Sequence, residues 1–338
     1  MKSKRWKRSV KSTENLLVVF LKGFETVKYL VIGVGGTGGA IAAYLTKAGI
    51  DTTLIARGKN LSALRENGIT LSLDNNEYTN AVKAFDMNGF ENAVKSGAAL
   101  SPDVIFVCVK GYSITDTIPF IKSVSKPETV VIPILNIYGT GRHMQKELPS
   151  LTVTDGCIYV SSSLVSPGKI HMYGSIFRIV YGLPSHKKDD SRLIKIESDL
   201  KLANITPVFS DNVEKDTLQK FSYVSPMAGC GLYFGANAAE MQKPGAEREL
   251  FSELISEIET LAAAMGIKYE KSLVKINLDI LDALSPDAST SMQRDIAAGK
   301  QSEIDGLIYE VVRLADKYGL SLPAYRKISE KFRLDGLK

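Results

Sequence analysis

The 338-residue chain has few of the side chains that build disulfide frameworks or metal centres. It contains 3 cysteines and 3 histidines, and the histidines are scattered without the short spacing of metal ligands. A small, odd number of cysteines in apolar sequence is typical of reduced thiols that fill the core of a cytoplasmic protein. The sequence therefore predicts a cytoplasmic location and no metal site, and it shows no Ser-His-Asp arrangement.

Long hydrophobic runs are also absent. No segment approaches the roughly 20 uninterrupted apolar residues of a membrane span. The apolar run at residues 16–21 follows a basic start, but it is short and lacks a small-residue cleavage site, so it is not typical of a secretory signal. We therefore predict no membrane partner.

An excess of charge exists only at the N-terminal end. The whole chain has a formal net charge of +5, and residues 1–14, with six cations and one acid, account for all of it. A balanced remainder lacks the basic groove that nucleic acid requires, so we predict no nucleic-acid partner. Residues 1–26 are predicted to form a disordered basic tail or an over-long start; binding of nucleic acid or a membrane surface through it remains an alternative.

The chain does contain a glycine-rich turn between two predicted elements. Residues 29–32 form an apolar run typical of a buried strand, and residues 39–47 are small residues typical of a helix. Between them, Gly33 allows a sharp turn, Gly35 lets a pyrophosphate approach the backbone, and Gly38 lets the helix pack closely on the strand. The pattern predicts a nicotinamide or flavin dinucleotide site, with an ordinary tight turn as the alternative.

The end of the next strand predicts which dinucleotide binds. An enzyme that uses NAD usually places a carboxylate there, to bind the ribose 2′-hydroxyl. This chain places Arg57 and Lys59 after a predicted strand at residues 52–55. Two cations suit a 2′-phosphate, so the sequence favours NADPH/NADP; a solvated basic loop is the alternative.

Two further predicted strands end in polar residues. The apolar run at 104–109 is followed by Lys110, and the run at 129–135 is followed by Asn136. Ligands of doubly wound sheets bind beyond the carboxyl ends of the strands. Lys110 and Asn136 are therefore candidate site residues, unless they are ordinary loop residues.

The remaining pattern divides the chain near residue 210. A helix at 60–67, a strand at 69–73 and more strands within 156–182, with a turn at 166–168, are predicted before it. After it, helical periodicity dominates. Two apolar stripes carry that periodicity: Phe251, Leu254, Ile255, Ile258 and Leu261, and then Ile304, Leu307, Ile308 and Val311.

The predicted fold class is α/β, with an N-terminal Rossmann-type dinucleotide-binding domain followed by an all-α C-terminal domain. We place an NADP-binding Rossmann-type domain at residues 27–210 and a helical domain at residues 211–338.

From about residue 28 to its end, the chain resembles the ketopantoate reductase family (2-dehydropantoate 2-reductases). Each matching motif is weak alone, but their order and spacing together are specific. The motifs are Ile32-Gly-Val-Gly-Gly-Thr-Gly38, Leu54-Ile-Ala-Arg-Gly58, Val107-Cys-Val-Lys-Gly111, Pro133-Ile-Leu-Asn136, Leu164-Val-Ser-Pro-Gly168, Gln219-Lys-Phe221, Ser291-Met-Gln-Arg-Asp295 and Glu303-Ile-Asp305.

The resemblance implies that the helical domain at residues 211–338 serves substrate binding and catalysis, and it implies roles for single residues. Lys220 matches the family's catalytic lysine, Ser291 its substrate-binding serine, and Glu303 the acid at the cofactor and lysine side of the cleft. Lys110 and Asn136 would contact the cofactor near the ribose and nicotinamide, and Asn136 would also meet the substrate. The alternatives are an exposed helix carboxylate at 303 and a helix cap at 291. The other implied cofactor contacts are Gly33, Val34, Gly35, Gly36, Thr37, Gly38, Arg57 and the backbone near Ser162.

A lysine suits the implied reduction of a keto carbon. Hydride arriving at that carbon drives negative charge onto the carbonyl oxygen, so a proton donor must lie within hydrogen-bond reach. A dry cleft would lower the pKa of Lys220, and a nearby Glu303 would raise it. A solvated helix lysine is the alternative. Pro226 favours the functional interpretation, because it leaves the carbonyl of Ser222 without its helical partner and favours a kink.

The chain departs from the family where asparagines usually bind substrate oxygens. Those positions hold Val224, Ala228 and Ala238, although Asn237 could substitute for the last, and Ile137 replaces the usual glycine after Asn136.

These departures bear on the predicted function, which is NADPH-dependent reduction of 2-dehydropantoate in pantothenate and coenzyme A biosynthesis. A reductase of a more apolar 2-oxo acid, or a non-catalytic NADP-binding regulator, is the alternative. A homodimer is compatible with each of these functions.

Overall fold

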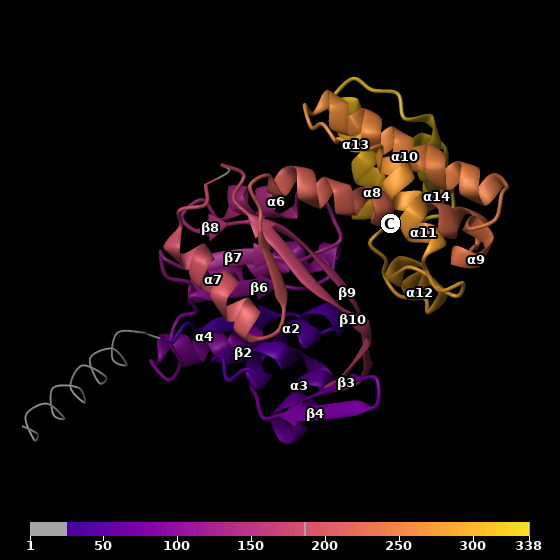
Figure 1. Ribbon diagram of the computed structural model, residues 1–338. Coiled ribbons are helices and arrows are strands. Elements are labelled where there is room, and N and C mark those ends of the chain that lie inside the picture. The colour runs from indigo at the N-terminus through magenta and orange to yellow at the C-terminus, as the bar shows by residue number, and fades with distance from the viewer. Residues whose placement is uncertain (1–25, 186, 338) are drawn as a thin grey trace, which may run out of the picture.

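The computed structural model describes residues 26–185 and 187–337. Figure 1 shows an α/β lobe followed along the chain by a helical lobe. The predicted fold class, a Rossmann-type α/β part followed by an all-α part, is confirmed. The prediction of a disordered tail falls on residues 1–25, outside the described residues, and on Thr26 alone within them.

A six-stranded parallel sheet forms the centre of the α/β lobe. Its strand order is β5-β2-β1-β6-β7-β8, so successive strands are added first on one side of β1 and then on the other. Doubly wound sheets bind ligands at such a point. Its strands are β1 (Tyr29–Ile32), β2 (Thr52–Ile55), β5 (Lys83–Phe85), β6 (Val104–Val107), β7 (Val130–Pro133) and β8 (Thr152–Val153).

Helices cover both faces of this sheet. Alternate residues of β1 point to opposite faces, and they belong to two different apolar clusters: Val31 packs with α2, whereas Ile32 packs with the helices of the other face. The helices of the lobe are α2 (Gly36–Lys47), α3 (Gly58–Asn67), α4 (Met87–Lys95), α5 (Ile114–Val124), α6 (Thr140–Glu147) and α7 (Ser191–Leu202), with a 3-10 turn η1 (Gly111–Ser113).

A second sheet packs on the far side of α2. Strand β10 pairs in parallel with β3 and β11 and antiparallel with β9, and β3 pairs with β4. The predicted strands at 69–73 and within 156–182 lie here, so the α/β lobe holds a second sheet that the sequence analysis did not anticipate. Its strands are β3 (Ile69–Leu73), β4 (Asn76–Asn80), β9 (Asp155–Ser166), β10 (Lys169–Gly182) and β11 (Thr206–Phe209).

The helical lobe begins with the longest helix, α8, which runs from the α/β lobe into the helical one (Figure 1). The two predicted apolar stripes are buried. The elements are α8 (Val213–Phe234), α9 (Ala238–Met241), α10 (Ala246–Ala264), α11 (Leu273–Asp282), α12 (Ser291–Ala297), the π-helix η2 (Asp305–Tyr309), α13 (Glu310–Lys317) and α14 (Pro323–Leu334).

The second stripe differs from its prediction in helix type. The spacing of Ile304, Leu307, Ile308 and Val311 indicates an ordinary α-helix, whereas residues Asp305–Tyr309 form a π-helix that continues into α13. Periodicity could not distinguish the two, because all four side chains are buried in either case. Single π turns inside helices occur frequently at functional sites.

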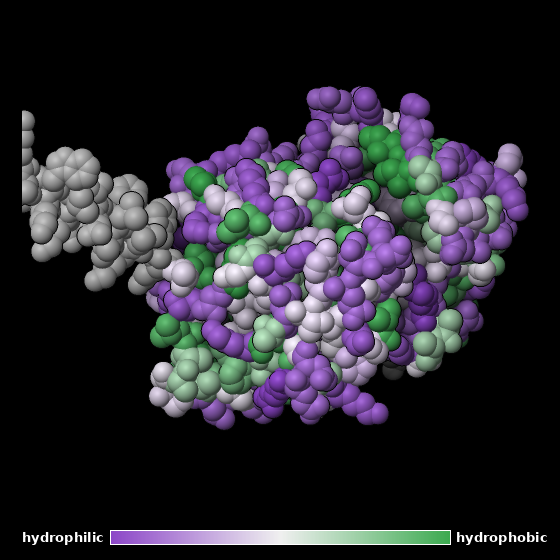
Figure 2. All heavy atoms as spheres, turned by 60° about the horizontal axis from the view of Figure 1, so that its bottom comes forward, coloured by the Kyte–Doolittle hydropathy of each residue, from purple (hydrophilic) through white to green (hydrophobic). Residues whose placement is uncertain are grey.

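The surface agrees with the composition. Figure 2 shows a face on which hydrophilic residues predominate and hydrophobic residues are interspersed in small groups. Among residues 26–185 and 187–337, no helix is both long and apolar enough to cross a bilayer.

Candidate active site

A cavity of about 850 Å³ lies at the carboxyl ends of the parallel strands. It is lined by the glycine turn after β1 and by the residues that follow β2, β6 and β7. Strand β9, the residues that follow β5, and two residues of the helical lobe, Ser291 and Glu303, also line it. The cavity therefore lies at the switch point of the sheet and reaches the helical lobe.

The glycine turn has the geometry that its sequence predicts. Gly33 has a φ of +93°, which a residue with a side chain rarely adopts. A Cβ on Gly38 would lie 2.0 Å from the Gly33 carbonyl oxygen, so only glycine lets α2 approach the turn. A Cβ on Gly35 would meet nothing within 4 Å, which leaves room for a ligand against the backbone at the start of α2.

Ser162 gives an independent indication of a ligand. It lines the cavity, its Oγ is buried, and this hydroxyl has no hydrogen-bond partner within the described part of the chain. A buried hydroxyl without a partner costs free energy unless a ligand or water satisfies it. Its carbonyl oxygen also lies against α2, because a Cβ on Gly36 would lie 2.5 Å from it. The cradle that these residues form fits a dinucleotide phosphate.

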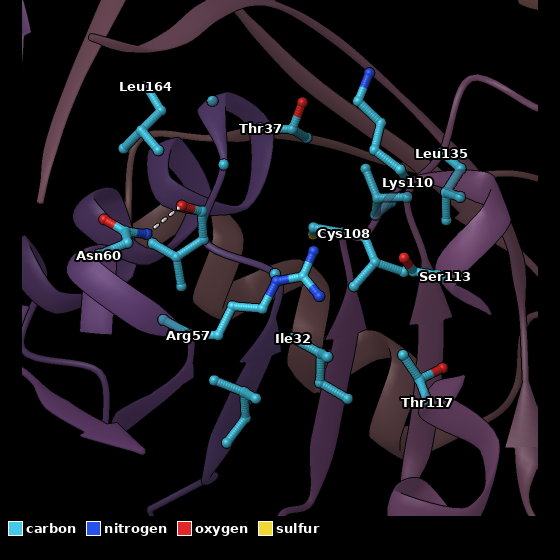
Figure 3. A pocket seen from close by; sticks show the side chains of 18 of the residues that line it. Ile32, Thr37, Arg57, Asn60, Cys108, Lys110, Ser113, Thr117, Leu135 and Leu164 are labelled. Carbon is cyan, nitrogen blue, oxygen red and sulfur yellow. Dashed lines mark hydrogen bonds between the residues drawn. The ribbon is translucent and has the colours of Figure 1, made fainter. Parts of the chain in front are cut away.

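The two predicted cations differ in position. Figure 3 shows the guanidinium of Arg57 extending into the cavity, and within residues 26–185 and 187–337 it has no ion-pair or hydrogen-bond partner. Lys59 is exposed in the first turn of α3 and does not line the cavity. Of these two cations, only Arg57 is therefore placed to meet an anion in this cavity.

Asn60 is a site residue that the sequence analysis missed. Its Nδ2 donates to the Val34 carbonyl oxygen at 2.8 Å, drawn as a dashed line in Figure 3. Its Oδ1 accepts from the Gly168 amide at 2.8 Å. This side chain thus ties the glycine turn to the turn between β9 and β10. An amide side chain one turn into the helix after Arg57 was the available signal.

Lys110 lies between two carboxylates of the helical lobe. Its Nζ is 2.8 Å from Asp295 Oδ2 and 2.9 Å from Glu303 Oε2, and the Gly111 amide donates to Glu303 Oε1 at 3.0 Å. Burial acts to lower the pKa of Lys110, but the two carboxylates outweigh it, so this pKa lies above its ordinary value. The motif Ser291 to Asp295 was recognised in the sequence, but no role was assigned to Asp295.

Among residues 26–185 and 187–337, no carboxylate is a hydrogen-bond partner of Lys220. Its Nζ donates to Asn136 Oδ1 at 3.0 Å and to the Ile158 carbonyl oxygen, and both of these residues line the cavity. Burial lowers the pKa of Lys220, with a smaller opposing effect from Cys157. A nearby Glu303 was expected to raise the pKa of Lys220, but Glu303 pairs with Lys110 instead.

Helix α8 carries Lys220 and is adapted to its internal proline. Pro226 cannot bond the Ser222 carbonyl oxygen, and Asn277 of α11 donates its Nδ2 to that oxygen at 3.0 Å. One residue before the proline, Ser225 Oγ donates at 2.6 Å to the carbonyl oxygen of Leu307, in the π-helix. Helix α8 is therefore fixed to two neighbouring elements just beyond Lys220.

The predicted substrate residues are placed unequally. Ser291 lines the cavity, and the cap of α12 is Thr290, so Ser291 is not the capping residue. Asn237 does not line the cavity, and it caps α9 by accepting from the Ala239 amide at 2.9 Å. The apolar residues at the positions where the family has asparagines pack with the core of the helical lobe. They are Val224, Ala228 and Ala238.

Comparison with known families covers most of the chain. The family model described as ketopantoate reductase PanE/ApbA matches residues 29–185, and the model described as ketopantoate reductase PanE/ApbA C terminal matches residues 212–334. An uncharacterized oxidoreductase, YkpB, of Bacillus subtilis (strain 168) is 25% identical over 306 residues, which cover 89% of this chain and 96% of the relative. A 2-dehydropantoate 2-reductase of Aquifex aeolicus (strain VF5) is 26% identical over 308 residues, which cover 90% and 95%.

Solved structures share the fold at lower identity. A 2-dehydropantoate 2-reductase from Methylococcus capsulatus superposes with a TM-score of 0.80 at 20% identity, covering 92% of this chain and 97% of that chain. A D-mandelate dehydrogenase solved with NADH and anilino(oxo)acetate has a TM-score of 0.77 at 20% identity, covering 89% and 96%. With both family models matched, the chain belongs to the ketopantoate reductase PanE/ApbA family, whose members are NAD(P)H-dependent oxidoreductases.

Proposed function

We propose that the chain is an NADPH-dependent reductase of a small 2-oxo acid, with 2-dehydropantoate as the lead substrate and pantoate as the product. The observation that carries this proposal is the position of Lys220. Its ammonium hydrogen-bonds to Asn136 and Ile158, two residues that line a cavity bounded by a dinucleotide-type glycine turn. The reaction would belong to pantothenate and coenzyme A biosynthesis, in the cytoplasm.

The cavity residues fit the dinucleotide. Gly35 leaves room at the start of α2, and the unpartnered Ser162 hydroxyl is available to a phosphate or ribose oxygen. The free guanidinium of Arg57 suits the 2′-phosphate of NADPH, because charge-assisted hydrogen bonds to phosphate are strong. When bound, the reduced nicotinamide supplies the hydride.

Lys220 would supply the proton. An ammonium has three donors, and Asn136 and Ile158 accept two of them. Lys220 does not itself line the cavity, but its third N–H would be available to a substrate whose carbonyl oxygen, where negative charge develops, lies beside Asn136 and Ile158. The lowered pKa makes the ammonium a better acid, and the reaction needs this group protonated at the start.

Lys110 would serve as a fixed positive charge. Glu303 and Asp295 raise its pKa and hold its Nζ at one end of the cleft. In this position it keeps its proton, and its third N–H can donate to an oxygen of cofactor or substrate, while the two carboxylates offset its positive charge. Glu303 acts in the proposal through Lys110 and the Gly111 amide, at the cofactor side of the cleft.

A reductase of a more apolar 2-oxo acid is the second candidate. Where the family usually has asparagines, Val224, Ala228 and Ala238 present no polar side-chain atom to a substrate hydroxyl. A site without that hydrogen bond loses selectivity for the hydroxylated substrate. The fold neighbour solved with anilino(oxo)acetate is a dehydrogenase of an aromatic hydroxy acid, which makes an aromatic oxo acid worth testing.

A panel of oxo acids tests the proposal. Purified protein is mixed with ketopantoate, 2-oxoisovalerate, phenylglyoxylate or pyruvate, with NADPH and then with NADH, and loss of nicotinamide absorbance is followed. We expect NADPH oxidation with ketopantoate and none with pyruvate. Faster oxidation with phenylglyoxylate or 2-oxoisovalerate favours the second candidate. Normal NADPH binding without oxidation by any oxo acid would contradict both and support a non-catalytic regulator.

A homodimer remains a prediction. A ketopantoate reductase from Staphylococcus aureus, with a TM-score of 0.75 and 19% identity to this chain, is described as dimeric. Light scattering of the purified protein gives the mass that tests it.

A further inference from the structure

Ile137 joins the two lobes by apolar packing beside the candidate site. It follows Asn136 in the loop between β7 and α6, and it is partly buried. A Cβ built on Gly111 would lie 2.2 Å from Ile137 Cδ1, and a Cβ built on Gly306 would lie 2.4 Å from the same atom. The isoleucine side chain therefore packs against the bare backbone of two glycines, one in each lobe.

These two glycines have no conformational reason to be glycine. Neither Gly111 nor Gly306 has a positive φ, so an alanine backbone would fit at both positions. What excludes a Cβ at each position is the side chain of Ile137. Ile137, Gly111 and Gly306 thus form one packing unit, which we call the Ile137 contact. The isoleucine side chain fills the space that side chains at the two glycines would need.

The Ile137 contact is surrounded by the polar groups of the proposed reaction. The Gly111 amide donates to Glu303 at 3.0 Å, and Lys110 precedes it. Gly306 lies in the π-helix that begins just after Glu303. On the other side, Asn136 precedes Ile137 and accepts from Lys220. Ile137 itself does not line the cavity.

We propose that Ile137 is a positioning residue for the reaction proposed above. Its side chain sets the distance between the loops that carry Lys110 and Asn136 and the π-helix that follows Glu303. Close packing makes such a contact hard to deform, so a change in the size of any member displaces the polar groups beside it. This role rests on the proposed function, because enzyme activity is the property that the experiment measures.

The contact distances predict a specific pattern of rescue. Beyond Cδ1, the next Ile137 atom from a Cβ on Gly111 is Cγ1 at 3.7 Å, so Ile137→Val removes that clash. A Cβ on Gly306 also meets Cγ1 at 2.7 Å and Cγ2 at 3.0 Å. Valine keeps both of these atoms, and only Ile137→Ala removes them. Valine should therefore rescue Gly111→Ala and fail to rescue Gly306→Ala.

The experiment measures kcat and KM for the single and double variants, well below their melting temperatures. Gly306→Ala should lower kcat by about 10²-fold, the effect of a displacement near 1 Å at a reacting centre, and Gly111→Ala, whose Cβ clashes only with the terminal Cδ1, should lower it by a smaller factor. G111A/I137V should return to the kcat of I137V, and G306A/I137A to that of I137A, while G306A/I137V stays low. KM for the dinucleotide should rise in both glycine variants, but by a smaller factor than kcat falls. Ile176→Ala, on a 70% exposed side chain of β10, is the matched control.

Failure of valine to rescue Gly111→Ala, or equal rescue of both glycine variants by valine, would overturn the proposal. If Gly306→Ala does not fold, the Gly111 pair decides alone. If the unmodified protein oxidises NADPH with no oxo acid, the proposed function fails separately. NADPH affinity, measured by fluorescence, then replaces kcat as the readout. Gly111→Ala should weaken NADPH binding, and G111A/I137V should restore it. Failure of the double variant to restore binding would contradict the positioning role of Ile137.

Discussion

Lys110 is surrounded by charged partners and Lys220 by neutral ones, although both lysines lie beside one cavity. Lys110 is held by two carboxylates, which raise its pKa, whereas Lys220 is held by an amide oxygen and a backbone carbonyl oxygen, and burial lowers its pKa. When neighbouring groups have their pKa values moved apart, they are suited to different tasks. Lys110 is suited to remain a charge, and Lys220 is suited to give up a proton.

Removing the amine of Lys220 should have the largest effect. General acid catalysis is typically worth about 10² to 10⁴ in rate, so Lys220→Met should lower kcat by that factor. NADPH affinity, measured by fluorescence, should change little, because the proposal assigns binding of the dinucleotide to the glycine turn and Arg57. The control is Lys275→Met in α11, whose side chain is 76% exposed. Equal losses in the two variants, or a fully active Lys220→Met, would contradict the assigned role.

Neutralising Glu303 should have an intermediate effect. Glu303→Gln keeps the shape of the side chain but removes one of the two negative charges that pair with Lys110. A hydrogen bond to a charged group contributes about 1.5–3 kcal/mol, so kcat/KM should fall roughly 10- to 100-fold. Steady-state kinetics with saturating NADPH measure it. If Lys220→Met and Glu303→Gln change the pH profile in the same way, the two lysines are not distinct in function.

Replacing Arg57 should affect only one of the two dinucleotides. Arg57→Gln should raise KM for NADPH by about tenfold, the loss of one charged hydrogen bond, and leave KM for NADH nearly unchanged. Lys59→Gln tests the prediction that both cations bind the 2′-phosphate. The sequence pattern predicts that this variant binds NADPH more weakly, whereas the position of Lys59 outside the cavity predicts no change in NADPH binding. An equal effect of Arg57→Gln on both dinucleotides would argue against a 2′-phosphate contact.

Local features of the fold could be predicted closely from the sequence. The strands at 29–32, 52–55 and 69–73 match the structure residue for residue, because apolar runs between turn residues determine them. The strands predicted at 104–109 and 129–135 are shorter, at Val104–Val107 and Val130–Pro133. Apolar residues such as Val109 and Leu135 line the cavity instead, and a single sequence does not distinguish a cavity wall from a strand.

Contacts between distant segments could not be predicted. The second sheet depends on pairing β10 with β3, about 100 residues apart, and no local pattern specifies that partner. The same holds for the two lysines. Strand topology predicted Lys110 as a candidate site residue, and the resemblance implied Lys220 and Glu303, but which lysine meets the carboxylate depends on how the helical lobe packs on the sheet. Asn60 was missed for the same reason, since both its partners come from other elements.

The pH dependence of kcat/KM in the wild type and in Asn136→Asp tests the central claim most directly. Lys220 must be protonated to act, so kcat/KM should fall as pH rises through its lowered pKa, below the ordinary 10.5 of lysine. Asn136→Asp places a carboxylate 3.0 Å from Nζ and makes Lys220 resemble Lys110. The fall should then move to higher pH by about one to three units. A fall that stays at the same pH in Asn136→Asp would contradict Lys220 as the proton donor.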